Sequence, residues 1–420
     1  MKMVKSLLLG SVAGIAAITG AQAADLPLAE PVEYVRICDT WGNGYFYIPG
    51  TQTCLQISGL VRFDLRYEEP FDRANDALTF RGRAQLQFDA RTQTELGTLR
   101  SYLRMRGNYI NNANTATDGD DFYVHQAFVQ FAGFTAGKTQ SFFDAVYDGS
   151  FTGAYNSEVT STALLGYTAT FGSGWSASLS IEDRSNREVA GGGAVALLGA
   201  PIAYAGTMMP DVVANVRVAQ GWGSFQLSGA IHQNRDNTEV GGLWVGADDE
   251  YGFAVQAAGA VNLPMGGQGT RLWASAAYAD GAIGYLGTVA SPWVGSGTTG
   301  GIARADSFVI ADGAGGFGLE TSSGWAITGG GTWVFNPVFR SNLTLGYADV
   351  ESDVVSLVGG APVGDFSQFI AAANVIYTPV QNLDLGLEVF YRNIVDDNFD
   401  TPVITNDDSW GVMGRVERKF

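Results

Sequence analysis

The chain has no run of 18 apolar residues beyond its first 23 residues, and this absence excludes a bundle of membrane-spanning helices. Histidine and cysteine are scarce, with two of each in 420 residues. No G-x-S-x-G motif occurs, and His125 and His232 are isolated from each other, so the sequence does not indicate a Ser-His-Asp site. Acidic residues outnumber basic ones by 42 to 24, and the net charge of −18 argues against nucleic-acid binding.

The first 23 residues have the order of a secretory signal peptide. Lys2 and Lys5 precede an apolar run over 7–18, and Ala21-Gln22-Ala23 follows it. A membrane anchor would need roughly 20 apolar residues, and this run is shorter and rich in Gly and Ala. We therefore expect cleavage before Ala24.

The two cysteines, Cys38 and Cys54, form a close pair in an exported chain, which favours a disulfide. A metal site would need two further ligands, and neither histidine is near the pair in sequence. Residues 24–53 contain three prolines and no clean periodicity. We expect them to form an irregular periplasmic leader that the disulfide joins to the first strand.

From Cys54 onward, apolar and polar side chains alternate with the period of a β-strand. Most segments have about 10 to 14 residues, which is long for a soluble protein and suits a tilted membrane strand. A soluble sandwich also alternates, but its charged face meets water and its apolar face meets another sheet. The sixteen segments are 54–67, 78–91, 99–106, 122–132, 134–142, 163–171, 174–184, 211–220, 224–233, 251–262, 271–280, 324–335, 338–349, 367–377, 383–393 and 409–420.

Seven short connections and eight long ones alternate between these segments, as an outer-membrane barrel requires when both chain ends lie in the periplasm. The last segment ends on an aromatic residue, and a terminal strand needs a partner on both sides. We therefore predict an all-β fold, a transmembrane antiparallel β-barrel of 16 strands over 54–420. Phe420 would close the barrel against the strand that begins near Leu55.

Inward positions of the first three predicted strands hold eight of the 24 basic residues. Guanidinium groups stay ionised, so these residues would make a permanently positive wall with few acidic residues between them. A solvated sheet face without a role in selectivity is the alternative. The residues are Arg62, Arg66, Arg81, Arg83, Arg91, Arg100, Arg104 and Arg106, with Lys138 added from the fifth strand.

The long segment after the fifth strand, SFFDAVYDGSFTGAYNSEVTST, carries acidic residues and no basic one. Folded into the lumen, it would set carboxylates opposite the arginines and create a transverse field in which polar solutes pass. An external loop is the alternative. Its candidate constriction residues are Phe142, Phe143, Asp144, Asp148 and Glu158.

Two segments resemble signature segments of the alphaproteobacterial general porins found in Brucella, rhizobia and their relatives. They are EPVEYVRICDTWGNGYFYIPGTQTCLQISGLVRFD at 30–64 and FAGFTAGKTQSFFD at 131–144. The resemblance implies a homotrimer of sixteen-stranded barrels in which the loop after the fifth strand folds inward as a constriction. It places Phe142, Phe143, Asp144 and Asp148 in that loop, and Arg62, Arg81, Arg83, Arg104 and Arg106 on the opposing wall.

We therefore predict a passive diffusion channel for small hydrophilic solutes and ions in the bacterial outer membrane, without catalysis or a resident cofactor. A channel specific for sugars or anions and an outer-membrane hydrolase are the alternatives. The arginines favour anions, whereas the acidic outer loops attract cations, so the sequence predicts only a weak preference. By resemblance to outer-membrane proteins generally, Phe420 is also expected to be read by the barrel-assembly machinery.

Acidic residues gather in the predicted outer loops, at 68–76, 118–121, 248–250 and 396–408. Oxygen ligands of this kind suit hard divalent cations. These loops are therefore candidates for binding lipopolysaccharide phosphates through Mg²⁺ or Ca²⁺, and a solvated loop face is the alternative.

Overall fold

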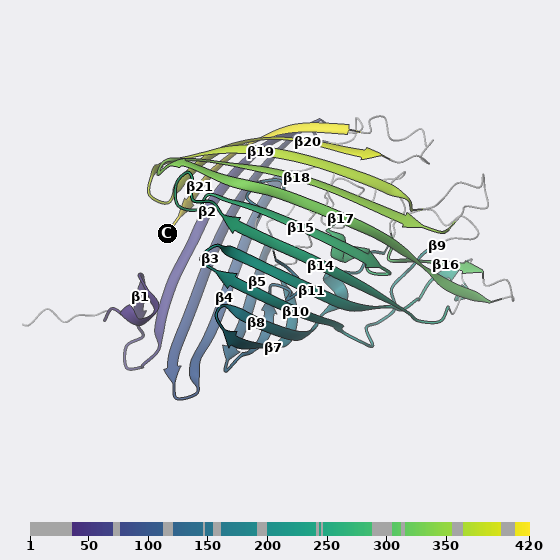
Figure 1. Ribbon diagram of the computed structural model, residues 1–420, viewed down its shortest axis with the longest axis horizontal. Coiled ribbons are helices and arrows are strands. Elements are labelled where there is room, and N and C mark those ends of the chain that lie inside the picture. Colours follow the sequence, from purple (N-terminus) through teal and green to yellow (C-terminus); the bar gives the residue numbers. More distant parts are fainter. Residues whose placement is uncertain are drawn as a thin grey trace, which may run out of the picture.

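The computed structural model describes residues 36–69, 76–111, 121–145, 148–153, 161–190, 200–240, 243–244, 247–287, 305–311, 316–354, 364–395 and 408–420. Sixteen of its strands form a closed antiparallel barrel (Figure 1), which confirms the predicted fold. In order around the ring they are β2 (Cys54–Glu68), β3 (Leu78–Thr94), β4 (Gly97–Asn111), β5 (Asp121–Phe131), β6 (Phe134–Thr139), β7 (Thr162–Gly172), β8 (Trp175–Glu182), β10 (Asp211–Gln220), β11 (Gly223–Asn234), β14 (Glu250–Asn262), β15 (Arg271–Asp280), β17 (Phe317–Asn336), β18 (Phe339–Ser352), β19 (Phe366–Val380), β20 (Leu383–Val395) and β21 (Asp408–Lys419).

Short and long connections lie at opposite ends of the barrel. Figure 1 shows tight turns at the end that holds the C-terminus, here called the turn end, and longer connections at the other, the loop end. Along the described chain, no helix is long and apolar enough to cross a membrane. Its helices are single 3₁₀ turns, namely η1 (Asp39–Trp41), η2 (Arg184–Asn186) and η3 (Ile283–Leu286).

Strand limits agree with the sequence to within three residues, except at β4, which ends five residues later than predicted, and at β17. Strand β6 ends at Thr139, before the predicted limit of 142, because the chain there turns away from the wall. Strand β17 begins at Phe317, seven residues before the predicted 324, because its first part pairs with β16 (Ser307–Ala311). Strand β16 also pairs with β9 (Ala200–Pro201), and this addition projects from the loop end (Figure 1). Two further short strands, β12 (Glu239–Val240) and β13 (Leu243–Trp244), pair with each other.

Alternation along each strand separates an apolar outside from a polar inside. On β2, Val61 and Phe63 are exposed on the outer face, whereas Asp64 is buried on the inner face. Aromatic rings on adjacent strands pack in pairs on the outside, such as Tyr67 with Trp410, whose centroids lie 5.5 Å apart. This inverted distribution is the one that a lipid-facing barrel needs.

The main buried apolar cluster lies inside the loop end. It joins Phe143, from the segment after β6, to Ile283 and Leu286 of η3 and to inward residues such as Ile370 of β19. Packing of this kind fixes the segments that fold back into the barrel mouth.

The seam between β2 and β21 is paired along its whole length. Residues from Leu60 to Glu68 pair with β21, and Phe420 then exchanges two backbone hydrogen bonds of 2.9 and 3.0 Å with Gly59. Strand β1 (Tyr45–Tyr47) covers the rest of the β2 edge, and the predicted disulfide between Cys38 and Cys54 is present beside it. The leader is thus not irregular throughout, because β1 completes the edge of β2. The predicted signal peptide, residues 1–23, lies outside the described residues.

Substituting Gly59 should weaken barrel closure, because a Cβ there would lie 2.7 Å from Cζ of Phe420 and 2.3 Å from the Gln85 carbonyl oxygen. We expect Gly59→Val to destabilise the folded barrel by about 1–3 kcal/mol. Gly229→Val is the matched control, since Gly229 also faces outward and its nearest contact would be 3.8 Å away. The measurement is the fraction of folded, heat-modifiable protein on semi-native gels after refolding. Equal folding of the two variants would contradict this account of the seam.

Candidate functional site

The chain after β6 leaves the wall and lies inside the barrel. Residues 141–145 and 148–153, together called the inner loop, accept hydrogen bonds from inward side chains of distant strands. Asn215 of β10 donates to the Phe142 carbonyl at 2.6 Å, and Asn374 of β19 donates to the Gly149 carbonyl at 3.0 Å. The inner loop therefore crosses the lumen from β6 and follows the far wall.

Glu388 of β20 holds the tip of the inner loop. Its buried carboxylate accepts the backbone N–H groups of Phe151 and Thr152 at 2.5 and 2.8 Å, together with the Thr152 hydroxyl at 2.5 Å. The neighbouring Gly386 leaves room for the ring, since a Cβ there would lie 2.3 Å from Cζ of Phe151. The Arg415 guanidinium covers the same ring at 4.1 Å. The tip is thus tied to β20 and β21.

Phe142 and Phe143 anchor the root of the inner loop. Phe143 is fully buried, and its ring packs edge-on against Tyr285 of η3 at 4.7 Å. The Phe142 ring lies beside Gly166 of β7, where a Cβ would be 2.6 Å from it. These two predicted constriction residues therefore lie against the wall and η3.

The predicted position of Asp144 is wrong. Its buried carboxylate does not face the arginine wall, because it pairs with Arg187 Nη2 at 2.7 Å. Arg187 follows η2 in a later loop, and strand periodicity does not reveal such a partner. Asp148 accepts a hydrogen bond from the Thr344 hydroxyl of β18 at 2.6 Å and so is also held by the far wall. Glu158 lies outside the described residues.

Four of the eight predicted wall arginines have carboxylate partners, so the expectation of few interleaved acids is wrong. Alternation identified their inward faces but not the carboxylates on adjacent strands. Asp89 bridges both Arg91 and Arg100, at 2.8 and 2.9 Å. Arg62 pairs with Glu417 of β21 at 2.5 Å, and Arg66 pairs with Glu68.

The other four arginines contact no carboxylate within the described chain. Arg83 donates to Asn108, Arg104 to Gln87 and Arg106 to Gln85, at 2.8, 2.9 and 2.6 Å. Arg81 is in register with Asp64, but Asp64 accepts two hydrogen bonds from Arg415 of β21, at 2.6 and 3.0 Å. Lys138 of β6 donates to the Val124 carbonyl at 3.4 Å. Strands β3 and β4 thus keep a surplus of positive charge that amide side chains orient.

Ring order places this surplus opposite the inner loop. Strands β14 and β15 stand eight places from β3 and β4 in the ring of sixteen, which is the opposite side. The inner loop bonds to β10 and β11 on one flank of that side and to β18, β19 and β20 on the other. The arginines of β3 and β4 therefore lie across the ring from most of the loop, whereas the loop tip at β20 is three strands from β3.

A small cavity lies under the loop tip, with a volume of about 70 Å³. Phe151, Ile376 and Gly386 form its apolar side, and two carboxylates, Asp384 and Glu417, lie among its cations. The four cations are Arg62, Arg340, Arg415 and Lys419. The positive surplus thus continues from the wall to the underside of the tip.

Sequence reasoning missed the residues that hold the loop: Asn215, Thr344, Asn374, Glu388 and Arg187. The first four are polar residues at inward strand positions, and alternation could have marked them as lumen-facing. Only the folded chain shows that they meet the inner loop.

Comparison with known proteins identifies the chain. Residues 25–413 match a family described as a porin subfamily. Porin Omp2b of Brucella neotomae is 29% identical over 441 residues, covering 99% of each chain. Porin Omp2b of Brucella canis is 37% identical over 246 residues, covering 53% of this chain and 64% of that protein.

Solved structures share the fold at low identity. The outer membrane channel DcaP of Acinetobacter baumannii superposes with a TM-score of 0.65 at 18% identity, over 89% of this chain and 99% of that one. An anion-selective porin from Comamonas acidovorans gives a TM-score of 0.52 at 12% identity, over 88% of this chain and all of that one. With its closed barrel and inner loop, the chain belongs to the porin family and is a general diffusion porin, a non-enzymatic β-barrel channel of the outer membrane.

Proposed function

We propose that the pore is narrowest between the inner loop and the inward arginines of β3 and β4, and that it favours anions. The observation that carries this proposal is the asymmetry of charge across the lumen. Arg81, Arg83, Arg104 and Arg106 have no carboxylate partner among the described residues, whereas the Asp144 carboxylate of the inner loop does not face them and is neutralised by Arg187. A local positive potential concentrates anions at the narrowest point, whatever the sign of the total charge.

The cavity under the loop tip supports a second candidate function, a channel with some specificity for small acidic solutes. Its four cations exceed its two carboxylates, and Phe151 supplies an apolar side. A solute carboxylate could contact Arg340 or Lys419 there, because both side chains line the cavity, where they pair with Asp384 at 2.8 and 3.1 Å. Block of the current by millimolar succinate but not by glucose would favour this candidate.

Further proposals concern the oligomeric state, the processing, the assembly and the cation binding of the protein. We propose a homotrimer, in line with OmpT of Vibrio cholerae, a related fold described in a trimer form. We also propose that residues 1–23 are a cleaved signal peptide, that 24–53 form the periplasmic leader, and that the assembly machinery reads Phe420. The suggestion of divalent cations at lipopolysaccharide rests on acidic loops that are largely outside the described residues, and those described include no group of three or more possible metal ligands.

Replacing Glu388 by Gln should loosen the loop tip. The amide keeps the shape but turns charge-assisted hydrogen bonds to Phe151 and Thr152 into neutral ones, and bonds to a charged group contribute about 1.5–3 kcal/mol each. We expect larger fluctuations of open-channel current in planar bilayers. Glu351→Gln is the control, because Glu351 is exposed at the other end of β18 from the turn. Identical current traces from the two variants would argue against a loop held by Glu388.

Removing charge from the arginine wall should shift selectivity toward cations. For Arg104→Gln with Arg106→Gln, we expect a change of tens of millivolts in the reversal potential measured across a tenfold salt gradient, since about 59 mV is the full range per decade for a monovalent ion. The control, Arg217→Gln with Arg418→Gln, removes the same charge near the turn end and should have a smaller effect. An equal effect of the two pairs would place the selective region elsewhere.

A further inference from the structure

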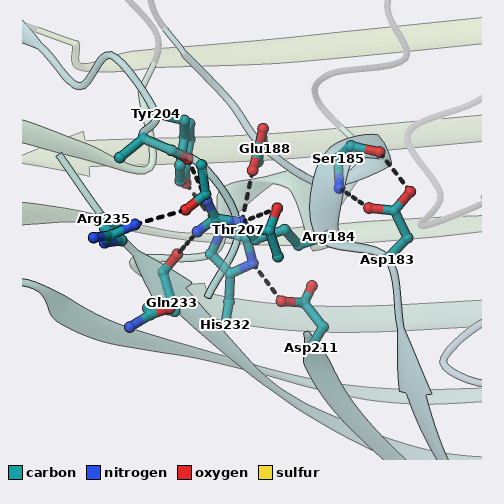
Figure 2. Close-up of polar contacts among 12 residues, drawn as sticks. Asp183, Arg184, Ser185, Glu188, Tyr204, Thr207, Asp211, His232, Gln233 and Arg235 are labelled. Atoms are coloured by element: carbon teal, nitrogen blue, oxygen red, sulfur yellow. Dashed lines mark hydrogen bonds and ion pairs between the residues drawn. The ribbon is translucent and has the colours of Figure 1, made fainter. Parts of the chain in front are cut away.

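A cluster of buried ionisable side chains lies at the loop end, where the connections after β8 and β15 fold over β10 and β11. His232 of β11, Asp211 at the start of β10 and Asp306 are all fully buried. Figure 2 shows the His232 ring pointing toward Asp211, with Tyr204 and Arg184 beside it. Charges removed from water in this way persist only when they are paired and hydrogen-bonded.

Three short contacts join these groups into one chain. His232 Nδ1 lies 2.8 Å from Asp211 Oδ1, His232 Nε2 lies 2.9 Å from the Tyr204 hydroxyl, and that hydroxyl lies 2.7 Å from Asp306 Oδ2. The hydroxyl is also 2.7 Å from Asn234 Oδ1, an atom that can only accept.

A count of protons shows that these hydrogen-bonded groups need more protons than ionised carboxylates, a neutral imidazole and a neutral tyrosine would supply. Asp211 also accepts the Tyr285 hydroxyl at 2.6 Å; with this carboxylate ionised, both of its oxygens only accept, and Nδ1 of His232 donates to it. The Tyr204 hydroxyl has one proton and cannot donate to Asp306, Asn234 and a neutral imidazole together. A further proton on His232 Nε2 or on Asp306 is therefore needed for a second of these contacts to be a hydrogen bond, and protons on both are needed for all three. Burial raises the pKa of the Asp306 carboxyl to about 6, which agrees with this count.

The same cluster is connected to the root of the inner loop. Tyr285, held by Asp211, packs against Phe143, and the Arg187 guanidinium lies 4.3 Å from the Tyr285 ring centre. Arg187 in turn pairs with Asp144 of the inner loop.

Asp306 joins the two covering connections directly. It accepts the backbone N–H groups of Val189 at 2.7 Å and of Gly284 at 3.4 Å. A change of charge on Asp306 or His232 would thus act on the segments that carry Arg187 and Tyr285.

Several elements packed around His232 contribute a charged or titratable group, whereas β14 places Gly252 beside it. Arg184 of η2 is fully buried, covers the Tyr204 ring at 5.1 Å and pairs with Glu188 at 2.8 Å. Burial raises the pKa of the Glu188 carboxyl. The groups facing the imidazole are therefore Asp211 from β10, Tyr204 and Asp306 from the covering connections, and Arg184 with Glu188 behind Tyr204.

We propose that this cluster is a proton-held latch, in which a proton shared along His232, Tyr204 and Asp306 keeps the root of the inner loop in place and is released as the pH rises. Its loss leaves two buried carboxylates beside a neutral imidazole and breaks one hydrogen bond of the chain. A group whose folded pKa is raised stabilises the fold fully below its unfolded pKa and loses that effect as the pH rises through its folded pKa. The latch therefore loosens on the alkaline side.

The first test measures the protonation state of His232 and does not depend on the proposed pore selectivity. The chain has two histidines, so His125→Gln leaves His232 as the only imidazole. In the detergent-solubilised full chain with ¹⁵N-labelled histidine, we expect the titration midpoint of His232 to lie above that of a free imidazole, whose pKa is about 6.5. Tyr204→Phe, which removes the bridging hydroxyl and keeps the ring, should lower the midpoint. A His232 that is neutral at pH 6.5 and whose titration is unchanged by Tyr204→Phe would overturn the proposal.

The second test measures motion of the inner loop through fluctuations of the channel current. In planar bilayers between pH 6 and 9, we expect current fluctuations to increase several-fold with pH for the parent protein and for His125→Gln. His232→Gln cannot gain a charge at this position, so we expect its current fluctuations not to depend on pH. If this variant does not fold, Tyr204→Phe is measured instead, and its fluctuations should begin to increase at a lower pH than those of the parent protein. A pH dependence that persists unchanged in these variants would show that the latch does not act on the loop. The proposal rests on an inner loop that narrows the pore. If His232 titrates as expected in the first test but the current fluctuations of the parent protein do not change with pH, the result counts against the proposed position of the narrowest point instead.

Discussion

Backbone hydrogen bonding is the constraint on which the rest of this structure depends. In a lipid environment every N–H and C=O group must find a partner within the protein, and a sheet satisfies all of them only when it closes. Here β21 pairs with β2, Phe420 continues the pairing at Gly59, and β1 covers the remaining edge beside the Cys38–Cys54 disulfide. Two separate segments of the chain thus complete one edge.

Closure of the sheet places apolar side chains on the outside and polar side chains on the inside, and these polar side chains bind the inner loop. The lumen is lined with amide, hydroxyl and carboxyl groups that can bind a backbone folded against them. Glu388, Asn374 and Thr344 do so along the far wall, while Phe143 adds an apolar anchor at the root. The loop is therefore fixed by the wall it covers, and the arginine strands stay open to the lumen.

Charge inside the barrel is arranged by pairing more than by composition. An acidic chain with a net charge of −18 still presents a positive surplus on β3 and β4, because Asp89 of β3 is bound by Arg91 and Arg100, and Asp64 of the adjacent β2 is bound by Arg415. Buried ions persist where partners and hydrogen bonds replace water. The same requirement shapes the pair of Asp144 with Arg187 and the cluster around His232.

The sequence by itself determined the barrel, its sixteen strands, the alternation of turns and loops, the disulfide and the inward face of each strand, because all of these follow from a period of two and from spacing along the chain. It did not determine which inward groups meet. Arg62 and Glu417 are 355 residues apart, and Asp144 reaches Arg187 across two loops. Alternation assigns a face but not a neighbour on that face. Only closure of the sheet, with the loops folded into its mouth, decided which charges are neutralised and which remain free to act on a solute.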